Sequence, residues 1–307
     1  MGRKRRGDAI DGWIVIDKPS GMTSTQVVTQ VRRALNAAKA GHAGTLDPIA
    51  TGILPIALGA ATKTIPHLSE RRKGYWFQLC WGEERTTDDI EGTVTATSDL
   101  RPTADQIRAA LPRFTGAIQQ IPPNYSAVKV DGERAYDLAR ENTPLTLTPR
   151  TVQVYRMDLA GIPDPDHADF VVECGSGTYM RSLARDLARA LGGAGHVSAL
   201  RRLKVGPFTE AGAITLDKLK ALGHIPPPIA PVETVLDDIP ALAVTGDEAN
   251  RLRSGQAIAL LRRADIERLE AVEDGAEVCV MAEGRALALA RRDGATVRPV
   301  RILNPIP

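Results

Sequence analysis

Apolar and polar positions recur near the start of the chain in patterns typical of a strand followed by a helix. Residues 12–19 (GWIVIDKP) are an apolar run that ends at a Lys-Pro turn, which predicts a strand. Thr23 and Gln26 have the spacing of a capping box and predict the start of a helix. The apolar residues that then share one helical face are Val27, Val28, Val31 and Leu35.

Further segments along the chain have the apolar pattern of a strand or the apolar face of a helix. Strands are expected at 75–81, 93–97, 151–159 and 170–174, and the acidic turn TTDDIEG (86–92) makes the second strand the partner of the first. Helices are expected after a second capping box, Thr103 and Gln106, and over GTYMRSLARDLARALGG (177–193). A Pro-rich linker at 225–240 precedes β-like runs at 277–281 and 286–290, which predict a separate small β-rich domain.

Composition places the chain among soluble globular proteins. Its 307 residues suit about two domains, and 43% hydrophobic with 25% charged residues is enough for a packed core. We expect no membrane span, because no apolar run approaches the required ~18 residues, and MGRKRRGDAIDGW lacks the apolar stretch of a secretory signal. Three widely separated cysteines argue against a disulfide framework and fit a reducing cytoplasm.

The net charge of +2 hides an uneven distribution. Cations cluster at Arg3-Lys4-Arg5-Arg6, at Arg71-Arg72-Lys73 and at 201–204, whereas acids gather over 83–91. Such a layout permits a polyanion-binding face without a high overall charge. The alternative is that each cluster is ordinary solvated surface. We interpret the acidic residues 88–91 as surface rather than as a metal site.

Several kinds of chemistry have no support in the sequence. The phosphate-binding pattern GxxxxGK[ST] is absent, and GSGTYM (175–180) lacks the third glycine of a dinucleotide fingerprint. The five histidines stand apart without metal-ligand spacing, and no GxSxG elbow occurs. We therefore expect neither a cofactor nor a catalytic metal.

The most unusual segment is GHAGTLDPIATG (41–52). Small residues there allow close approach of another molecule, and they surround a single carboxylate, Asp47, followed by Pro48. Taken alone, an aspartate in such a loop is more often a turn or cap residue. A second segment, 121–140, interleaves basic and aromatic side chains as nucleic-acid contacts do.

Six blocks in the same order resemble the pseudouridine synthases of the TruB type. Besides 41–52 they are DKPSGMTS (17–24), KGYWFQLCWG (73–82), IPPNYSAVKVDGERAYDLAR (121–140), GTYMRSLARDLA (177–188) and LRRLKVGPF (200–208). The resemblance covers about residues 12–215. Ala43, Met180 and Leu203 depart from the residues usual in the family, and none of them is at a catalytic position.

The resemblance implies an α+β fold. A pseudouridine synthase catalytic domain with a mixed, mostly antiparallel sheet would span 12–235, with a thumb-like insertion at about 124–151. A small C-terminal β-rich domain, similar to PUA RNA-binding domains, would span 241–307, and residues 1–11 would be a basic tail.

The resemblance also implies a reaction and its residues. Asp47 would be the nucleophile in an isomerisation that breaks the N1–C1′ bond of a flipped uridine and rejoins uracil through C5; attack at the sugar or at the base stays open. Arg181 would pair with Asp47, and Tyr75 would stack on the uracil and assist proton removal. Tyr179 and Leu200 would enclose the base, and His42 would contact the RNA that the base has left. Lys18 and Pro19 would support the site.

The implied substrate is uridine 55 in the T loop of tRNA. We expect a cytoplasmic monomer with no membrane association, no obligate protein partner and no cofactor. Two alternatives stay open. One is an RNA-binding or RNA-folding module without catalysis, and the other is a sibling pseudouridine synthase that acts on another RNA.

Overall fold

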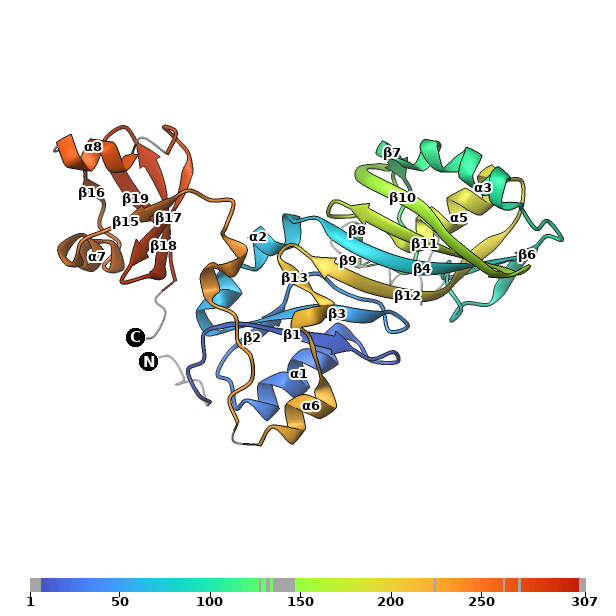
Figure 1. The fold of residues 1–307 in the computed structure, drawn as a ribbon, viewed down its shortest axis with the longest axis horizontal. Helices are drawn as coiled ribbons and strands as arrows, with labels where there is room; N and C mark the ends of the chain where they lie inside the picture. The colour runs from blue at the N-terminus through green and yellow to red at the C-terminus, as the bar shows by residue number, and fades with distance from the viewer. Residues whose placement is uncertain are drawn as a thin grey trace.

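The structure is a computed structural model, and it describes residues 7–126, 128–130, 133–134, 147–223, 225–261, 263–269 and 272–303. Within these residues the main sheet has ten strands (Figure 1). Eight of them run in the order β14-β1-β3-β12-β4-β11-β10-β7, while β2 pairs with β3 and β13 pairs with β12. Only β1–β14 and β3–β12 pair in parallel among these strands, so the mixed, mostly antiparallel sheet is confirmed.

The strands of the main sheet are β1 (Gly12–Lys18), β2 (Ala40–His42), β3 (Thr51–Leu58), β4 (Lys73–Trp81), β7 (Gly116–Gln120), β10 (Arg150–Asp164), β11 (His167–Cys174), β12 (Gly195–Val205), β13 (Phe208–Thr209) and β14 (Ile214–Thr215). Two short hairpins lie outside it, β5 (Glu83–Arg85) with β6 (Val94–Thr97), and β8 (Lys129–Val130) with β9 (Glu133–Arg134).

Helices cover one face of this sheet. They are α1 (Ser24–Ala34), α3 (Ala104–Ala110), α5 (Met180–Ala190) and α6 (Leu216–Ala221). Their apolar residues share one core with Ile14 and Ile16 of β1. The alternate residues Trp13 and Val15 face a second core, because successive side chains of a strand point to opposite sides. Both faces of β1 are therefore buried, as its unbroken apolar sequence requires.

The second core is closed by the C-terminal part of the chain. Its elements are β15 (Ala241–Ala243), α7 (Gly246–Arg253), β16 (Ile258–Ala259), α8 (Arg263–Leu269), β17 (Glu277–Ala282), β18 (Arg285–Asp293) and β19 (Thr296–Ile302). Cys279 and Leu289 of this five-stranded sheet pack in the same core as Trp13. The expected C-terminal β-rich domain is present, and it packs against α2 (Ile65–Glu70) and η4 (Val232–Val235) (Figure 1).

Several local predictions are confirmed. Both capping boxes form, at Thr23 with Gln26 and at Thr103 with Gln106. The helix expected over 177–193 is α5, and Gly192 follows its end with a positive φ of 86°. Glycine has no side chain and adopts this left-handed conformation readily, whereas other residues rarely do. The helix ends there because this conformation cannot continue a right-handed helix.

Other local predictions were wrong. The strand at 93–97 pairs with β5 rather than with 75–81, because β4 is already paired on both sides by β11 and β12. The loop expected over 41–52 is shorter, since β2 and β3 extend into it. The stretch 225–240 is not a free linker, because Val235 and Leu236 are buried in the second core. Most of the thumb-like insertion, including 135–146, lies outside the described residues.

Two of the three basic clusters are partly engaged inside the fold, while Arg72 and Lys204 stay exposed, so a polyanion-binding face there stays a prediction. Arg202 is fully buried, and Arg201 pairs with Asp17 and Glu210. In the cluster 71–73, Arg71 pairs with Asp237 and Asp238, Lys73 is buried, and Arg72 stacks on Tyr155. Residues 3–6 lie outside the described part of the chain.

Candidate active site

The loop that carries Asp47 is fixed by the segment between β1 and α1. Ser24, the first residue of α1, donates its hydroxyl to the carbonyl of Leu46 (3.1 Å) and accepts the N–H of the same residue (2.9 Å). Gly21 N–H donates to the carbonyl of Pro48 (2.8 Å). Because these bonds lie on both sides of Asp47, the block 17–24 holds the loop in one conformation.

Lys18 adds a buried cation to this attachment. Its ammonium donates to the carbonyls of Pro19, Pro48 and Ala50, at 2.9, 3.1 and 2.6 Å. Burial lowers the pKa of Lys18 to about 8, although the nearby Asp47 carboxylate raises it. Pro19 itself is exposed and contributes its carbonyl. Lys18 and Pro19 therefore lie beside the loop that carries Asp47, and their supporting role stays a prediction.

Asp47 meets Arg181 at the start of α5. The Oδ2 atom of Asp47 lies 3.0 Å from Nε of Arg181, and the side chains are 32% and 5% exposed. Nε is otherwise a buried donor without an aligned hydrogen-bond acceptor in the described structure, so this contact is an ion pair rather than a well-directed hydrogen bond. Burial raises the pKa of Asp47, and the Arg181 guanidinium opposes that rise. The carboxylate is thus partly exposed and lies opposite a fixed, buried positive charge.

Arg181 is itself held by groups on three other residues. Nη1 lies 3.3 Å from Oδ2 of Asp89 and donates to the carbonyl of Thr87 (3.0 Å), and Nη2 donates to the carbonyl of Tyr125 (2.9 Å). Asp89 is 2% exposed. The interpretation of the acidic segment 88–91 as surface was therefore wrong for Asp89, whose carboxylate is buried because it neutralises Arg181.

The same face of α5 carries two more arginines at intervals of four residues. Arg185 pairs with Asp88 (2.9 Å), whose side chain is only 13% exposed, and Arg189 pairs with Glu84 (2.6 Å). Three successive turns of α5 are thus bound to the acidic stretch 84–89. We call these pairs, Arg181–Asp89, Arg185–Asp88 and Arg189–Glu84, the arginine ladder.

Tyr75 enters the site from β4. It is buried, and burial raises the pKa of its hydroxyl, while the guanidinium of Arg202 lowers it. Arg202 faces Tyr75 across the β4–β12 pair and donates to the carbonyls of Ile53 (2.7 Å) and Gly44 (3.1 Å). The Asp47 charge also acts on the Tyr75 hydroxyl, so the structure brings these two candidate residues together.

The other candidate residues surround the same loop. Leu200 is buried on β12, and its carbonyl accepts a hydrogen bond from Thr51 just after the loop. Tyr179 precedes α5, and both its N–H and its carbonyl are bound by the amide of Gln120. His42 ends β2, and burial together with Arg202 lowers its pKa. Burial and, further, the Asp47 carboxylate raise the pKa of the Tyr179 hydroxyl, so Tyr179 lies near the same loop. The structure thus brings the candidate residues together around the segment 42–51.

Four residues of the site were missed by the sequence analysis, namely Asp89, Asp88, Arg185 and Arg202. The spacing of arginines at 181, 185 and 189 on a predicted helix, with acids clustered at 83–91, was an available signal for three of them. Arg202 had no such signal, because a basic residue in a charged run gives no indication of complete burial.

Comparison with protein families gives two adjacent matches. Residues 32–180 match the TruB family pseudouridylate synthase N-terminal domain, and residues 181–237 match the tRNA pseudouridylate synthase B C-terminal domain. Together these matches cover about two thirds of the chain. Their boundary falls inside the catalytic fold, between Met180 and Arg181.

Curated relatives match along nearly the whole chain. A protein of Bradyrhizobium diazoefficiens named tRNA pseudouridine synthase B is 55% identical over 98% of this chain and 88% of its own length. A protein of Caulobacter vibrioides with the same name is 51% identical over 99% of both chains. Among solved structures, the archaeal box H/ACA sRNP Nop10–Cbf5 complex contains a chain that matches with a TM-score of 0.71 and 26% identity, covering 97% of this chain and 87% of that one.

Proposed function

Because the chain belongs to the TruB family of pseudouridylate synthases, we propose that it isomerises a uridine of tRNA to pseudouridine, at position 55 in the T loop. The observation that carries this proposal is the pairing of Asp47 with Arg181 at 3.0 Å, close to Tyr75. A single carboxylate suits an isomerisation, since no water must be activated. A glycoside hydrolase more often uses two carboxylates on either side of the bond.

In the proposed reaction the target nucleotide leaves its stack and enters the site beside Asp47. Extrusion costs a few kcal/mol, which contacts to the flipped base and the phosphates offset. Asp47, as carboxylate, forms a transient bond to the nucleotide, at C1′ or at the base, and the N1–C1′ bond breaks. The uracil rotates and C5 bonds to C1′, and the bond to Asp47 breaks so that the carboxylate is regenerated. C5 then loses its proton and N1 gains one, so that atoms and charge balance.

Arg181 has two tasks in this scheme. Its positive charge favours the ionised form of Asp47 against the effect of burial, and its position fixes the direction of the carboxylate. The carbonyls of Thr87 and Tyr125 and the carboxylate of Asp89 keep the guanidinium in place. Little reorganisation is then needed when the base arrives.

We assign Tyr75 to stacking on the uracil. Because burial raises the pKa of its hydroxyl, the phenol stays protonated at neutral pH and is a poor base for the C5 proton. Leu200 and Tyr179 are assigned as further walls of the base pocket. His42, which burial keeps neutral, is assigned to the RNA at the position that the base has left.

The site is built from one chain, so we propose that the protein works as a monomer without an obligate protein partner. The described residues contain no helix long and apolar enough to cross a membrane. Three free cysteines fit the proposed place of action, the reducing cytoplasm. We further propose that the catalytic domain ends near 235, that 241–307 is a PUA-like RNA-binding domain, and that the thumb-like insertion orders over bound RNA.

The test is tritium release from C5-labelled uridine in a T-arm transcript. We expect the wild-type protein to release tritium and Asp47→Asn to release none, with RNA binding retained. Binding without release by the wild-type protein would favour the RNA-binding module instead. Release from ribosomal RNA alone would favour a sibling synthase.

A further inference from the structure

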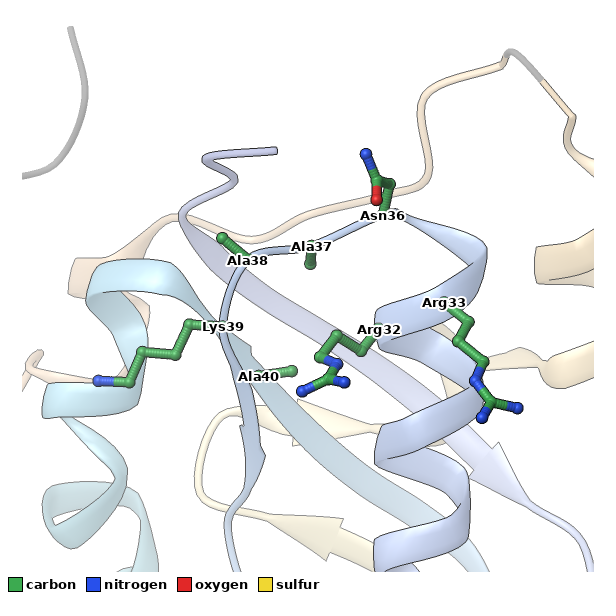
Figure 2. A pocket seen from close by; sticks show the side chains of 7 residues that line it. All are labelled: Arg32, Arg33, Asn36, Ala37, Ala38, Lys39 and Ala40. Carbon is green, nitrogen blue, oxygen red and sulfur yellow. The ribbon is translucent and has the colours of Figure 1, made fainter. Parts of the chain in front are cut away.

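A recess of about 500 Å³ lies between the end of α1 and the segment that leads into β2 (Figure 2). Its polar lining consists of Arg32, Arg33, Asn36 and Lys39, and three alanines complete the wall. Arg32 extends from α1 toward Ala40, the first residue of β2 (Figure 2). None of these residues belongs to the candidate active site.

The recess follows from how α1 ends. Asn36 adopts a positive φ of 46°, and the N–H of Ala37 reaches back to the carbonyl of Arg32 (2.9 Å). This turn closes the helix and leaves the two arginine side chains exposed on its last turn. The alanines that follow are too small to fill the space beside them.

The charge of the recess is strongly positive. Arg32 and Arg33 are exposed and make no ion pair with any residue that the structure describes. Cations stabilise the C-terminus of a helix through its dipole, which accounts for some of this charge. Lys39, beyond the helix, lines the same recess.

The N-terminal segment is bound to the rim of the recess. The N–H of Asp8 donates to the carbonyl of Asn36, and the carbonyl of Asp8 accepts the N–H of Ala38. Asp8 brings one acidic residue to this rim, against three cations that line the recess, Arg32, Arg33 and Lys39.

We propose that this recess binds a phosphodiester of the substrate RNA backbone, outside the candidate active site. Arginine presents planar donors that match phosphate oxygens, and the exposed amide of Asn36 adds a neutral donor. Lys39 is about 10 Å from His42 along the strand, at ~3.3 Å per residue. An RNA strand that leaves the catalytic site therefore needs to extend only a short way to reach the recess. The inference rests on the proposed function for the identity of the RNA.

The test compares Arg32→Gln/Arg33→Gln with wild type in the full-length protein. Glutamine keeps helix propensity, so the fold is retained, which a thermal melt checks. The matched control is Arg108→Gln/Arg113→Gln, which removes two exposed arginines at α3 and η2 (Leu111–Phe114), away from the recess (Figure 1). Dissociation constants for full-length tRNA are measured by filter binding across a salt series, together with KM and kcat for tritium release.

We expect the Arg32→Gln/Arg33→Gln variant to bind tRNA roughly tenfold more weakly. The slope of the logarithm of the binding constant against the logarithm of the salt concentration should fall in magnitude by about 1–2. KM should rise while kcat at saturating tRNA stays unchanged, and Arg32→Lys/Arg33→Lys should recover most of the binding because the charges return. The same affinity and salt slope in recess and control variants would overturn the proposal. So would a fall in kcat with KM unchanged.

The experiment also distinguishes a small-anion site from a failure of the proposed function. If a titration with inorganic phosphate detects binding that the recess variant loses, while tRNA affinity is unaffected, the recess is a small-anion site and the proposal is wrong. If wild type releases no tritium, the proposed function fails. The binding comparison still decides between the recess and the control face.

Discussion

Arg181 is the residue on which the charges of the site converge. Two carboxylates, those of Asp47 and Asp89, contact one buried guanidinium, and the charge of Asp89 raises the pKa of Asp47 further. Removing one partner from such a buried arrangement leaves an uncompensated charge, which is more costly than losing an exposed ion pair. We therefore expect Asp89 to be a positioning residue that acts on Asp47 through Arg181.

We expect Asp89→Asn to lower kcat about 10- to 100-fold, the effect of losing one charge-assisted contact worth roughly 1.5–3 kcal/mol. It should also move the acidic limb of kcat to lower pH, because a charge that raises the pKa of Asp47 is gone. A pH profile of single-turnover tritium release measures both effects.

Asp88→Asn is the matched control for this experiment. It removes a carboxylate of similar burial from the next pair of the arginine ladder, where Arg185 does not contact Asp47. Stability should fall in both variants, but the acidic limb should move only in Asp89→Asn. An unmoved limb in Asp89→Asn would mean that Asp89 serves the fold alone.

We expect Lys18 to give the activity a basic limb. Its pKa of about 8 means that the ammonium loses a proton just above neutral pH. A neutral amine has two N–H donors for the three carbonyls of Pro19, Pro48 and Ala50, so the catalytic loop loses one attachment and Asp47 loses a nearby positive charge. We expect kcat/KM to fall above about pH 8, and this component to be absent from Lys18→Met.

Stability should change in the opposite direction over the same range. The folded-state pKa of Lys18 lies below 10.5, so keeping the ammonium buried costs free energy at low pH. That cost is fully present below about pH 8 and is relieved between about 8 and 10.5. We therefore expect the free energy of unfolding, measured with denaturant, to rise with pH in the wild-type protein relative to Lys18→Met. A flat difference would refute the assignment.

At the scale of elements, the loop that carries Asp47 depends on the strands at its two ends. β3 begins directly after the loop and pairs in parallel with β12, at Thr51 with Arg201 and Gly52 with Arg202. Gly52 has a φ of +95°, and a Cβ there would overlap the carbonyl oxygen of Arg202. This close approach keeps Arg202 against the loop and beside Tyr75.

We expect Gly52→Ala to destabilise the fold by more than about 2 kcal/mol and to reduce tritium release, because β3 and β12 must separate. Gly116→Ala is the control, since Gly116 has a similar φ of +94° and no atom lies within 4 Å of the place that a Cβ would take. It should cost only about 1 kcal/mol of backbone strain. Thermal melts and single-turnover assays compare the two variants, and equal losses would show that the close approach is unimportant.

At the scale of the whole molecule, the C-terminal sheet is part of the structure that supports β1. One of its faces contacts α7 and α8 in a core of its own, while Cys279, Ala286 and Leu289 pack in the core of Trp13. Lys63 donates to the carbonyl of Ile302, and Arg301 donates to the carbonyl of Lys63. Deletion of residues 241–307 would therefore expose apolar surface as well as remove an RNA-binding candidate.

We expect Leu289→Ala to lower the free energy of unfolding by about 2–5 kcal/mol. Leu289 is buried, so its truncation leaves a cavity between the C-terminal sheet and the rest of the chain. Val300→Ala, at a position 62% exposed, should stay within about 0.5 kcal/mol of wild type. Hydrogen exchange should show loss of protection in β1 as well as in β18 for Leu289→Ala. Loss confined to β17–β19 would mean that the two parts unfold independently.

The sequence by itself determined the local elements and the identity of the chemical groups. Capping boxes, the periodicity of α1 and α5 and the glycine after α5 depend on neighbours within four residues, so they could be read directly. Asp47, Tyr75 and Arg181 were found through a resemblance, because an isolated aspartate, tyrosine or arginine has no distinctive local signature.

The tertiary structure alone decided which charges are internal. Asp89, Arg202 and Arg201 look like surface residues in the sequence, yet they are buried or paired with partners from other elements. A charge can be buried only where an opposite charge or a carbonyl meets it, and that meeting depends on which strands pair across the sheet. The solvent-facing basic recess at α1 and β2 was hidden for the same reason, since its openness depends on the packing of segments rather than on composition.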